Sequence, residues 1–501
     1  MGRAPGLTGR VLYGASFVAG VPLLAVLWAR ATNDLVPLPA LHAPAAGIAI
    51  AAGGLTLMVA GWATLLLRGR GLPMNAFPPP VLVTKGVYGW VSDPIYLGFG
   101  ALAAGVAIAA GSASGLWLVT PILWLAMAAL VAGYERPDLR RRFGAAFAPR
   151  PRIAWPRGGD GRPGGWERAS VLLLVFGPWL LAYYGVQRLG PPPDAFPVEF
   201  GFERSLPVLQ WTEAVYVLAY LFVPVTPLLL RTRAELRRFA FTGLLSTVVV
   251  TLLWLTIPAV VQYRPFEPSG LLGRLLRWEQ ESSAGVAAFP AFHVVWSLIA
   301  ADSWSRIGAG RGRRARAAAG WTLALLITAS CVTTGMHAIL DVVAAILIFI
   351  PLRDPAALRE NLRGAAQEIA NSWREWRLGP VRFLSHGIFA AIAAASGFAL
   401  AAMAAGPGSL AYLCIVAGAA LLGAGLWAQA LEGSSKLLRP FGFYGGLLGG
   451  LIGTALAGAL GADVVVLLGA WAVAAPWIQA IGRLRCLVQG CCHGGPATPA
   501  T

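Results

Sequence analysis

A histidine and an aspartate lie four residues apart in the apolar run CVTTGMHAILDVVAA, residues 331–345. The chain has only five histidines, so His337 is an unusual residue in this setting. On a helix, residues i and i+4 share a face, and Asp341 can then accept a hydrogen bond from the ring of His337. That bond fixes the tautomer and leaves the other ring nitrogen available as a nucleophile. The pair is either a packing accident or the reactive part of an active site.

Two further residues complete a set suited to phosphoryl transfer. His293 lies in FPAFHVVWS, where an apolar segment begins, and Arg264 lies in QYRPFEP, at the end of the preceding one. A guanidinium binds phosphate through paired hydrogen bonds, and a second imidazole can protonate a leaving oxygen. Ionisable residues within membrane segments are rare and usually functional. We therefore expect a nucleophile at His337, and the alternative is a group of incidental polar residues satisfied inside a helical bundle.

The elements that must position these residues are membrane helices. Hydrophobic residues make up 57% of the 501 residues and charged residues only 12%, with a mean hydropathy of +0.67. Soluble domains carry about 25% charged residues. Apolar stretches long enough to cross ~30 Å of hydrocarbon recur along the sequence. They predict an all-α, polytopic transmembrane helical bundle of about 12–14 spans.

The net charge of +17 indicates membrane orientation rather than nucleic-acid binding, because the arginines gather in particular loops and not along one face. Short basic loops stay in the cytoplasm. With the N-terminus in the cytoplasm, Arg264, His293 and His337 all fall on the opposite, periplasmic side. The excess of arginine over lysine, with abundant alanine and glycine, suggests a GC-rich bacterial genome, and we expect the bacterial inner membrane. The basic segments are 68–85, 134–167, 231–239, 306–318, 353–382 and 432–440.

Two breaks divide the chain into three membrane blocks. Residues 135–168 are rich in arginine, proline and glycine and predict a linker. Residues 354–380 have charged and apolar faces and predict an amphipathic helix at the membrane surface. The expected domains are therefore 1–167, 168–353 and 381–501, with 354–380 as a linker.

The middle block resembles the type-2 phosphatidic acid phosphatase superfamily over roughly residues 200–352. Its last motif is matched by Ser330, Gly335, His337 and Asp341, with Cys331 where the family has arginine. The middle motif is matched by Pro290 and His293, without its serine, and the first motif by Arg264 and Pro265, with Ile257 in place of lysine. The resemblance implies a phosphohistidine at His337, orientation by Asp341, general acid catalysis by His293 and phosphate binding by Arg264.

The first block resembles the isoprenylcysteine carboxyl methyltransferase and phospholipid methyltransferase group. Its two motifs are LVTKGVYGWVSDPIYLGFG and ERPDLRRRFGAAFAPRPRIAWPR. The family has Arg-His where this chain has Ser92-Asp93, and paired glutamates where it has Glu135-Arg136. The resemblance implies S-adenosylmethionine as cofactor, a cytoplasmic site, and a domain that is either catalytic or a lipid-facing scaffold. The matched candidates for cofactor binding are Tyr88, Pro94, Tyr96 and Glu135.

The third block ends in AIGRLRCLVQGCCHGGP, which resembles the signature of prolipoprotein diacylglyceryl transferases. The resemblance implies that Arg483 binds a phospholipid headgroup phosphate, with a lipoprotein or peptide as acceptor. Members of that family continue beyond this motif, so we expect a truncated version. Packing of helices by small residues also explains the glycines. Zinc binding is a further alternative, but adjacent cysteines are poor tetrahedral partners, so we expect no metal. The zinc candidates are Cys486, Cys491, Cys492 and His493.

Together these patterns predict a multidomain membrane enzyme that modifies a phospholipid or an isoprenoid-linked lipid. The expected main activity is phosphate-ester hydrolysis or phosphotransfer at the periplasmic face, with methyltransferase-like and diacylglyceryl transferase-like blocks beside it. Two alternatives remain open. In the first, the main activity is diacylglyceryl transfer from phosphatidylglycerol. In the second, all three sites are inactive and the protein is a lipid-binding or transport scaffold.

Overall fold

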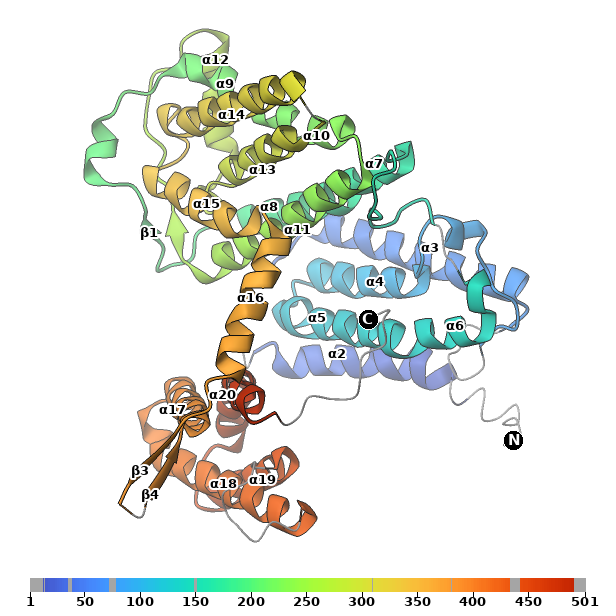
Figure 1. The fold of residues 1–501 in the computed structure, drawn as a ribbon, viewed down its shortest axis with the longest axis vertical. Helices are drawn as coiled ribbons and strands as arrows, with labels where there is room; N and C mark the ends of the chain where they lie inside the picture. Colours follow the sequence, from blue (N-terminus) through green and yellow to red (C-terminus); the bar gives the residue numbers. More distant parts are fainter. Residues whose placement is uncertain are drawn as a thin grey trace. The chain divides into compact units, whose positions relative to one another are not determined.

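The computed structural model describes residue 12 and residues 14–34, 38–71, 78–147, 151–308, 310–379, 381–432 and 442–490 (Figure 1). The protein is 76% helical, with very few strands. Within the described ranges, nine helices are long and apolar enough to cross a membrane, and four shorter apolar helices accompany them. The all-α, multi-pass fold class predicted from composition is confirmed. Two compact units divide the chain, Met1–Pro355 and Ala356–Thr501.

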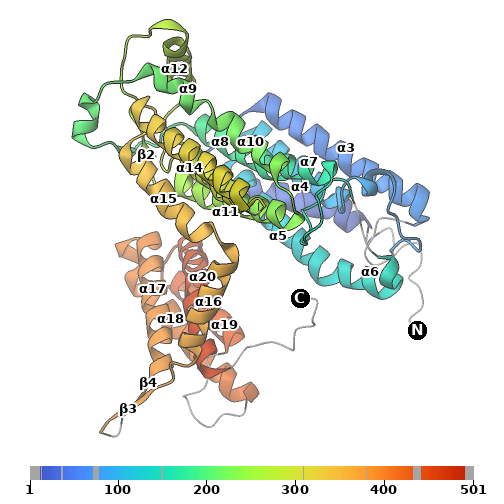
Figure 2. The ribbon, with the colours of Figure 1, turned by 45° about the horizontal axis from the view of Figure 1, so that its top comes forward.

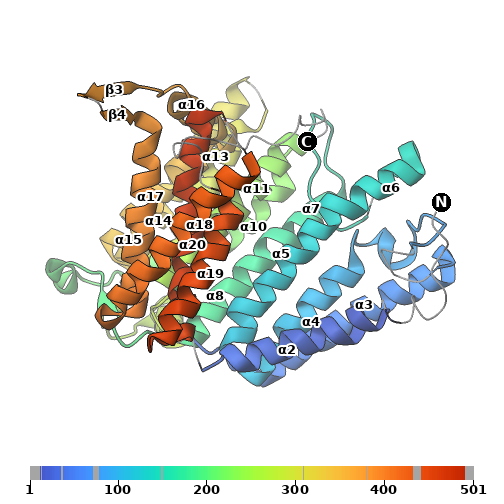
Figure 3. The same cartoon turned by 90° about the horizontal axis from the view of Figure 1, so that it is seen from below.

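The first part of unit 1 consists of membrane helices that lie side by side (Figure 3). The long segment from η3 to η5 is a single run that also includes most of the second methyltransferase-like motif. The elements are η1 (Ser16–Gly20), α2 (Val21–Thr32), α3 (Pro44–Gly69), η2 (Gly86–Gly89), α4 (Pro94–Ala110), η3 (Gly115–Val119), α5 (Thr120–Leu130), η4 (Val131–Glu135), α6 (Arg136–Phe143) and η5 (Gly144–Ala146).

Helices α3 and α4 approach each other through glycine. A Cβ atom built on Gly54 would lie 2.6 Å from the carbonyl oxygen of Gly98, whereas one built on the adjacent Gly53 would meet nothing within 4 Å. Small residues let helix backbones pack closely in a membrane, where hydrophobic burial does not drive helices together.

This packing predicts opposite effects for two neighbouring substitutions. Gly54→Ala forces backbone against backbone and is expected to lower stability by about 1–3 kcal/mol. Gly53→Ala adds a good helix former in open space and is expected to be neutral or slightly stabilising. Thermal unfolding of the purified protein in one detergent measures both. Equal destabilisation by the two variants would contradict the close approach of α3 and α4.

The second part of unit 1 surrounds a nearly fully buried helix, α13. Val294, Val295, Ala300 and Ala301 in this helix have no exposed surface, and α10, α11, α14 and α15 pack around it. Its elements are α7 (Gly165–Val171), η6 (Leu172–Phe176), α8 (Gly177–Leu189), β1 (Phe196–Pro197), η7 (Gly201–Ser205), η8 (Gln210–Thr212), α9 (Glu213–Tyr216), α10 (Ala219–Leu229), α11 (Arg233–Thr256), β2 (Ala259–Val260), α12 (Gly270–Ser282), α13 (Phe292–Arg306), α14 (Gly310–Thr333) and α15 (Ile339–Leu352). The short strands β1 and β2 pair in parallel.

Unit 2 is a separate helical bundle in which α17 packs against α20 and α18 against α19 (Figure 2). Gly423 and Gly445 bring the backbones of α18 and α19 close together, which fits packing by small residues. The elements are α16 (Pro355–Ala370), β3 (Glu375–Leu378), β4 (Val381–Leu384), α17 (Ser385–Ala405), η9 (Pro407–Ser409), α18 (Leu410–Glu432), α19 (Phe443–Ala459) and α20 (Val464–Gln489). Strands β3 and β4 form an antiparallel hairpin.

Candidate active site

Two histidines from distant parts of the sequence meet in unit 1. His293 is the second residue of α13, and His337 lies in the turn between α14 and α15. Their ring centroids are 5.8 Å apart, and the ring planes are inclined by 62°. The buried position of α13 holds the first ring in place, while the turn delivers the second. The structure thus brings together the two imidazoles on which the expected chemistry depends.

His337 and Asp341 also lie close together, but not for the reason expected from the sequence. A shared helix face is the wrong explanation, because α15 begins only at Ile339 and His337 precedes it. Asp341 instead reaches back over the start of the helix, and its Oδ2 accepts a hydrogen bond from the backbone N–H of Ala338 at 2.8 Å. The same Oδ2 lies 3.4 Å from Nδ1 of His337. A carboxylate is favoured at a helix N-terminus, and here it faces the imidazole as well.

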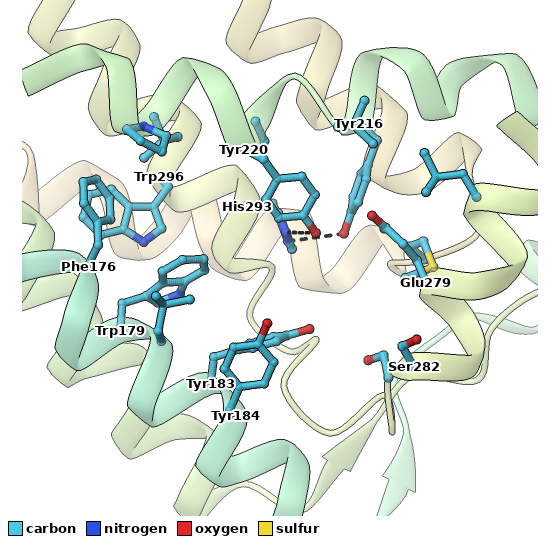
Figure 4. A pocket seen from close by; sticks show the side chains of 18 of the residues that line it. Phe176, Trp179, Tyr183, Tyr184, Tyr216, Tyr220, Glu279, Ser282, His293 and Trp296 are labelled. Atoms are coloured by element: carbon cyan, nitrogen blue, oxygen red, sulfur yellow. Dashed lines mark hydrogen bonds between the residues drawn. The ribbon is translucent and has the colours of Figure 1, made fainter. Parts of the chain in front are cut away.

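Two tyrosines hold His293 from the opposite side. The hydroxyl oxygen of Tyr216 lies 3.4 Å from Nδ1, and that of Tyr220 lies 3.2 Å from Nε2 (Figure 4). Tyr216 is fully buried and its ring also approaches His337, with centroids 6.4 Å apart. Both tyrosines were missed in the sequence, although their i, i+4 spacing in the apolar segment EAVYVLAY places two hydroxyls on one side.

Arg264 anchors the turn that carries His337. Its guanidinium donates a hydrogen bond to the carbonyl oxygen of Leu206 at 3.0 Å and another to that of Val332. Gly335, with φ +75°, passes against the arginine, and a Cβ at this position would lie 3.0 Å from the Cβ of Arg264. These contacts are made to protein backbone, so the direct observation is positioning of the turn. Phosphate binding by Arg264 stays a prediction.

A cavity of about 570 Å³ opens beside His293. Helices α8, α10, α12 and α13 contribute to its wall, and eight of its 19 lining residues are phenylalanine, tyrosine or tryptophan (Figure 4). Met336, directly before His337 in the sequence, also lines it. A cavity of this size accommodates a ligand the size of a lipid headgroup. The described residues therefore place His293 in the wall of a space for a substrate, with His337 next to His293 but not in the wall.

The four candidates for cofactor binding gather in a second place in unit 1. Pro94 begins α4, and two residues later the hydroxyl of Tyr96 donates a hydrogen bond to the carboxylate of Glu135. Burial raises the pKa of Tyr88, and the negative charges of Glu135 and Asp93 raise it further.

Beside this group, Arg136 forms an ion pair with Asp93 at 3.3 Å. The phospholipid methyltransferase group has a basic residue at the position of Asp93 and an acidic residue at the position of Arg136. This ion pair therefore has its acid and its base exchanged relative to that group. The group comprises two acids, two phenols and one guanidinium that is paired with one of the acids, and these side chains suit the ammonium and carboxylate of an amino-acid group.

The remaining candidate, Arg483, lies in α20 of unit 2 and is exposed. Gly490 ends that helix, whereas Cys491, Cys492 and His493 lie outside the described residues. Across the described part of the chain, no group of three or more histidine, cysteine, aspartate or glutamate side chains is arranged to hold a metal ion.

Comparison with protein-family models agrees with two of the three resemblances. Residues 198–351 match the PAP2 superfamily, and residues 44–146 match the phospholipid methyltransferase family. Neither match extends to the third block, so the resemblance of 381–501 to diacylglyceryl transferases is without support. Searches of curated proteins and of solved structures found no match. The chain thus carries a PAP2 superfamily domain and a phospholipid methyltransferase-like region in one multi-pass membrane protein.

Proposed function

We propose that the PAP2 domain hydrolyses or transfers a phosphate ester of a membrane lipid through a phosphohistidine at His337. The observation that carries this proposal is the 5.8 Å separation of the His293 and His337 rings beside a cavity. Asp341 faces Nδ1 of His337, which leaves Nε2 as the attacking atom. Orientation by the Asp341 carboxylate prepares this imidazole for attack.

The reaction proceeds in two balanced steps. His337 Nε2 forms a bond to phosphorus while the bond from phosphorus to the leaving alcohol oxygen breaks, and His293 gives its proton to that oxygen. Water or an acceptor hydroxyl then displaces the histidine, and His293 takes up the proton of the incoming nucleophile. Water gives hydrolysis, and an acceptor hydroxyl gives phosphotransfer. For these proton transfers Nε2 of His293 exchanges its contact with the Tyr220 hydroxyl for the reacting oxygen, while Tyr216 keeps Nδ1 in place.

The setting we propose is the periplasmic face of a bacterial inner membrane, with a phospholipid or an isoprenoid-linked lipid as substrate. Support comes from the arginine-rich loops on the opposite side of the predicted topology. Purified protein in detergent, incubated with ³²P-labelled lipids, tests the activity directly. Release of phosphate or its transfer to an acceptor, together with label bound to protein through an acid-labile bond, is the expected result. Absence of both with every lipid class would overturn the proposal.

The methyltransferase-like region supports a second activity, methyl transfer to a lipid. The observation that favours it is the gathering of Tyr88, Tyr96, Glu135 and Arg136 at one place. S-adenosylmethionine would supply the methyl group there. Glu135 would hold the ammonium of the cofactor and Arg136 its carboxylate, each by a charge-assisted hydrogen bond.

Substitution of Glu135 tests this assignment by binding rather than turnover. Glu135→Gln keeps the shape of the side chain but removes its charge, and we expect binding of S-adenosylmethionine to weaken about 10-fold or more. Isothermal titration with the purified protein measures the change. Asp138→Asn, on the neighbouring turn of α6, is the matched control and is expected to bind normally. Equal affinity for Glu135→Gln and the original protein would remove Glu135 from the cofactor site.

A further inference from the structure

The cavity beside His293 has a feature that phosphoryl transfer does not require. Aromatic rings are the most frequent side chains in its wall, and several belong to α8, where Trp179, Tyr183 and Tyr184 face the cavity (Figure 4). Trp278 of α12 completes this set. Tyr184 and Trp278 are 66% and 62% exposed, so their rings remain accessible at the opening. The face of an aromatic ring carries negative electrostatic potential and attracts a cation.

A carboxylate lies in the same wall. Glu279 of α12 lines the cavity together with His293, and it forms no ion pair with any other described residue. The nearby Arg277 is held over the ring of Phe266, 4.9 Å from its centroid, and donates a hydrogen bond to the carbonyl oxygen of that residue. Burial raises the pKa of Glu279 to about 7. A desolvated carboxylate of this kind is stabilised by a cation that enters the cavity.

A second buried acid lies near this region. Glu213 of α9 is fully buried, and neither of its carboxylate oxygens has a hydrogen-bond partner among the described residues. It interacts electrostatically with Glu279. A cation that enters the cavity favours the ionised form of these buried acids, whereas an anionic headgroup opposes it. The same arrangement favours a positively charged group.

We propose that the cavity binds the methylated ammonium headgroup of a zwitterionic phospholipid, with Glu279 and the surrounding aromatic rings enclosing the cation. A quaternary ammonium has no N–H to donate, so recognition depends on ring faces and a carboxylate rather than on hydrogen bonds. The lipid phosphate, which follows the ammonium by a two-carbon link, then lies on the side of the two histidines.

This inference rests on the proposed function, since it names the substrate class of the same site. It also relates the two family matches chemically. A phospholipid methyltransferase-like region would supply lipids with methylated amine headgroups. At the PAP2 domain the bond from phosphorus to the diacylglycerol oxygen would break as the bond to His337 Nε2 forms, and water or an acceptor hydroxyl would then release the phosphorylated headgroup from the histidine.

Binding of short-chain lipids tests the inference without turnover. Full-length protein in a maltoside detergent is titrated with dihexanoyl phosphatidylcholine and with dihexanoyl phosphatidylglycerol, and affinities are measured by calorimetry. We expect the choline lipid to bind at least about 10-fold more tightly than the glycerol lipid, because aromatic rings and a carboxylate enclose its cation. Equal affinities would overturn the proposal.

Matched variants assign the preference to this cavity. Glu279→Gln and Trp278→Leu are expected to reduce the preference at least about 5-fold, because each removes part of the enclosure. Glu281→Gln, on the same helix, and Trp211→Leu, with a 65% exposed side chain, lie outside the cavity wall and are expected to keep it. A preference that survives both cavity variants would also overturn the proposal. Since binding and turnover are separate measurements, loss of one does not conceal the result of the other.

Discussion

His337→Ala is expected to reduce lipid phosphate release by at least about 10³-fold, because the substitution removes the atom that forms the covalent intermediate. The turn that carries His337 is fixed by backbone hydrogen bonds, including one from the N–H of His337 to the carbonyl oxygen of Cys331 at 3.0 Å. These bonds do not involve the imidazole. We therefore expect the variant to fold and to lose chemistry alone.

The measurement is release of labelled phosphate by purified protein, accompanied by trapping of protein-bound label. His42→Ala is the matched control, because His42 is exposed and lies outside the PAP2 domain. It is expected to behave like the original protein. If His337→Ala retained a substantial rate or trapped label, His337 would not be the nucleophile.

His293→Gln is expected to slow release of an alcohol leaving group by about 10²–10⁴-fold, the usual contribution of a general acid. Glutamine is similar in size and can still contact Tyr216 and Tyr220, so the aromatic surroundings should persist. The specific prediction concerns the leaving group. In an activated ester such as p-nitrophenyl phosphate, the leaving group departs without protonation. The substitution should therefore slow phosphoryl transfer from this ester to His337 far less than transfer from the lipid.

Measurement of both substrates with both proteins separates general acid catalysis from a structural role. A purely structural defect would slow the two esters equally, and that outcome would remove His293 from the acid role. A small effect on the activated ester with a large effect on the lipid supports the assignment. Tyr216→Phe gives an independent comparison, since it disturbs the position of His293 without removing its proton.

The sequence was sufficient for the membrane character of the protein and for the identity of its two matched regions. Long apolar segments predict helices because a membrane leaves the backbone no partner outside itself. The motif around His337 identified the PAP2 domain from a few residues. The same reasoning extended to residues 381–501, but there short glycine- and cysteine-containing patterns also arise from helix packing, and no family match supports the assignment.

The partners of the site residues required the tertiary structure. Asp341 reaches His337 from the start of α15, which depends on where that helix begins. Tyr216 and Tyr220 come from segments more than seventy positions away from His293 in the chain, at separations of 77 and 73 residues. Arg264, expected to face a phosphate, binds two carbonyl groups beside the turn. Each outcome depends on side-chain directions that spacing alone does not fix.

By itself, then, the sequence determined that the chain is a polytopic helical membrane protein with phosphatase-like and methyltransferase-like regions, because hydropathy and motif spacing are local properties. Only the tertiary structure decided that His293 and His337 meet, that tyrosines surround the first, and that Glu279 lines the same cavity as His293. The physical reason is that these contacts join α9, α10, α12, α13 and the turn before α15, and their approach is set by how the helices pack around the buried α13.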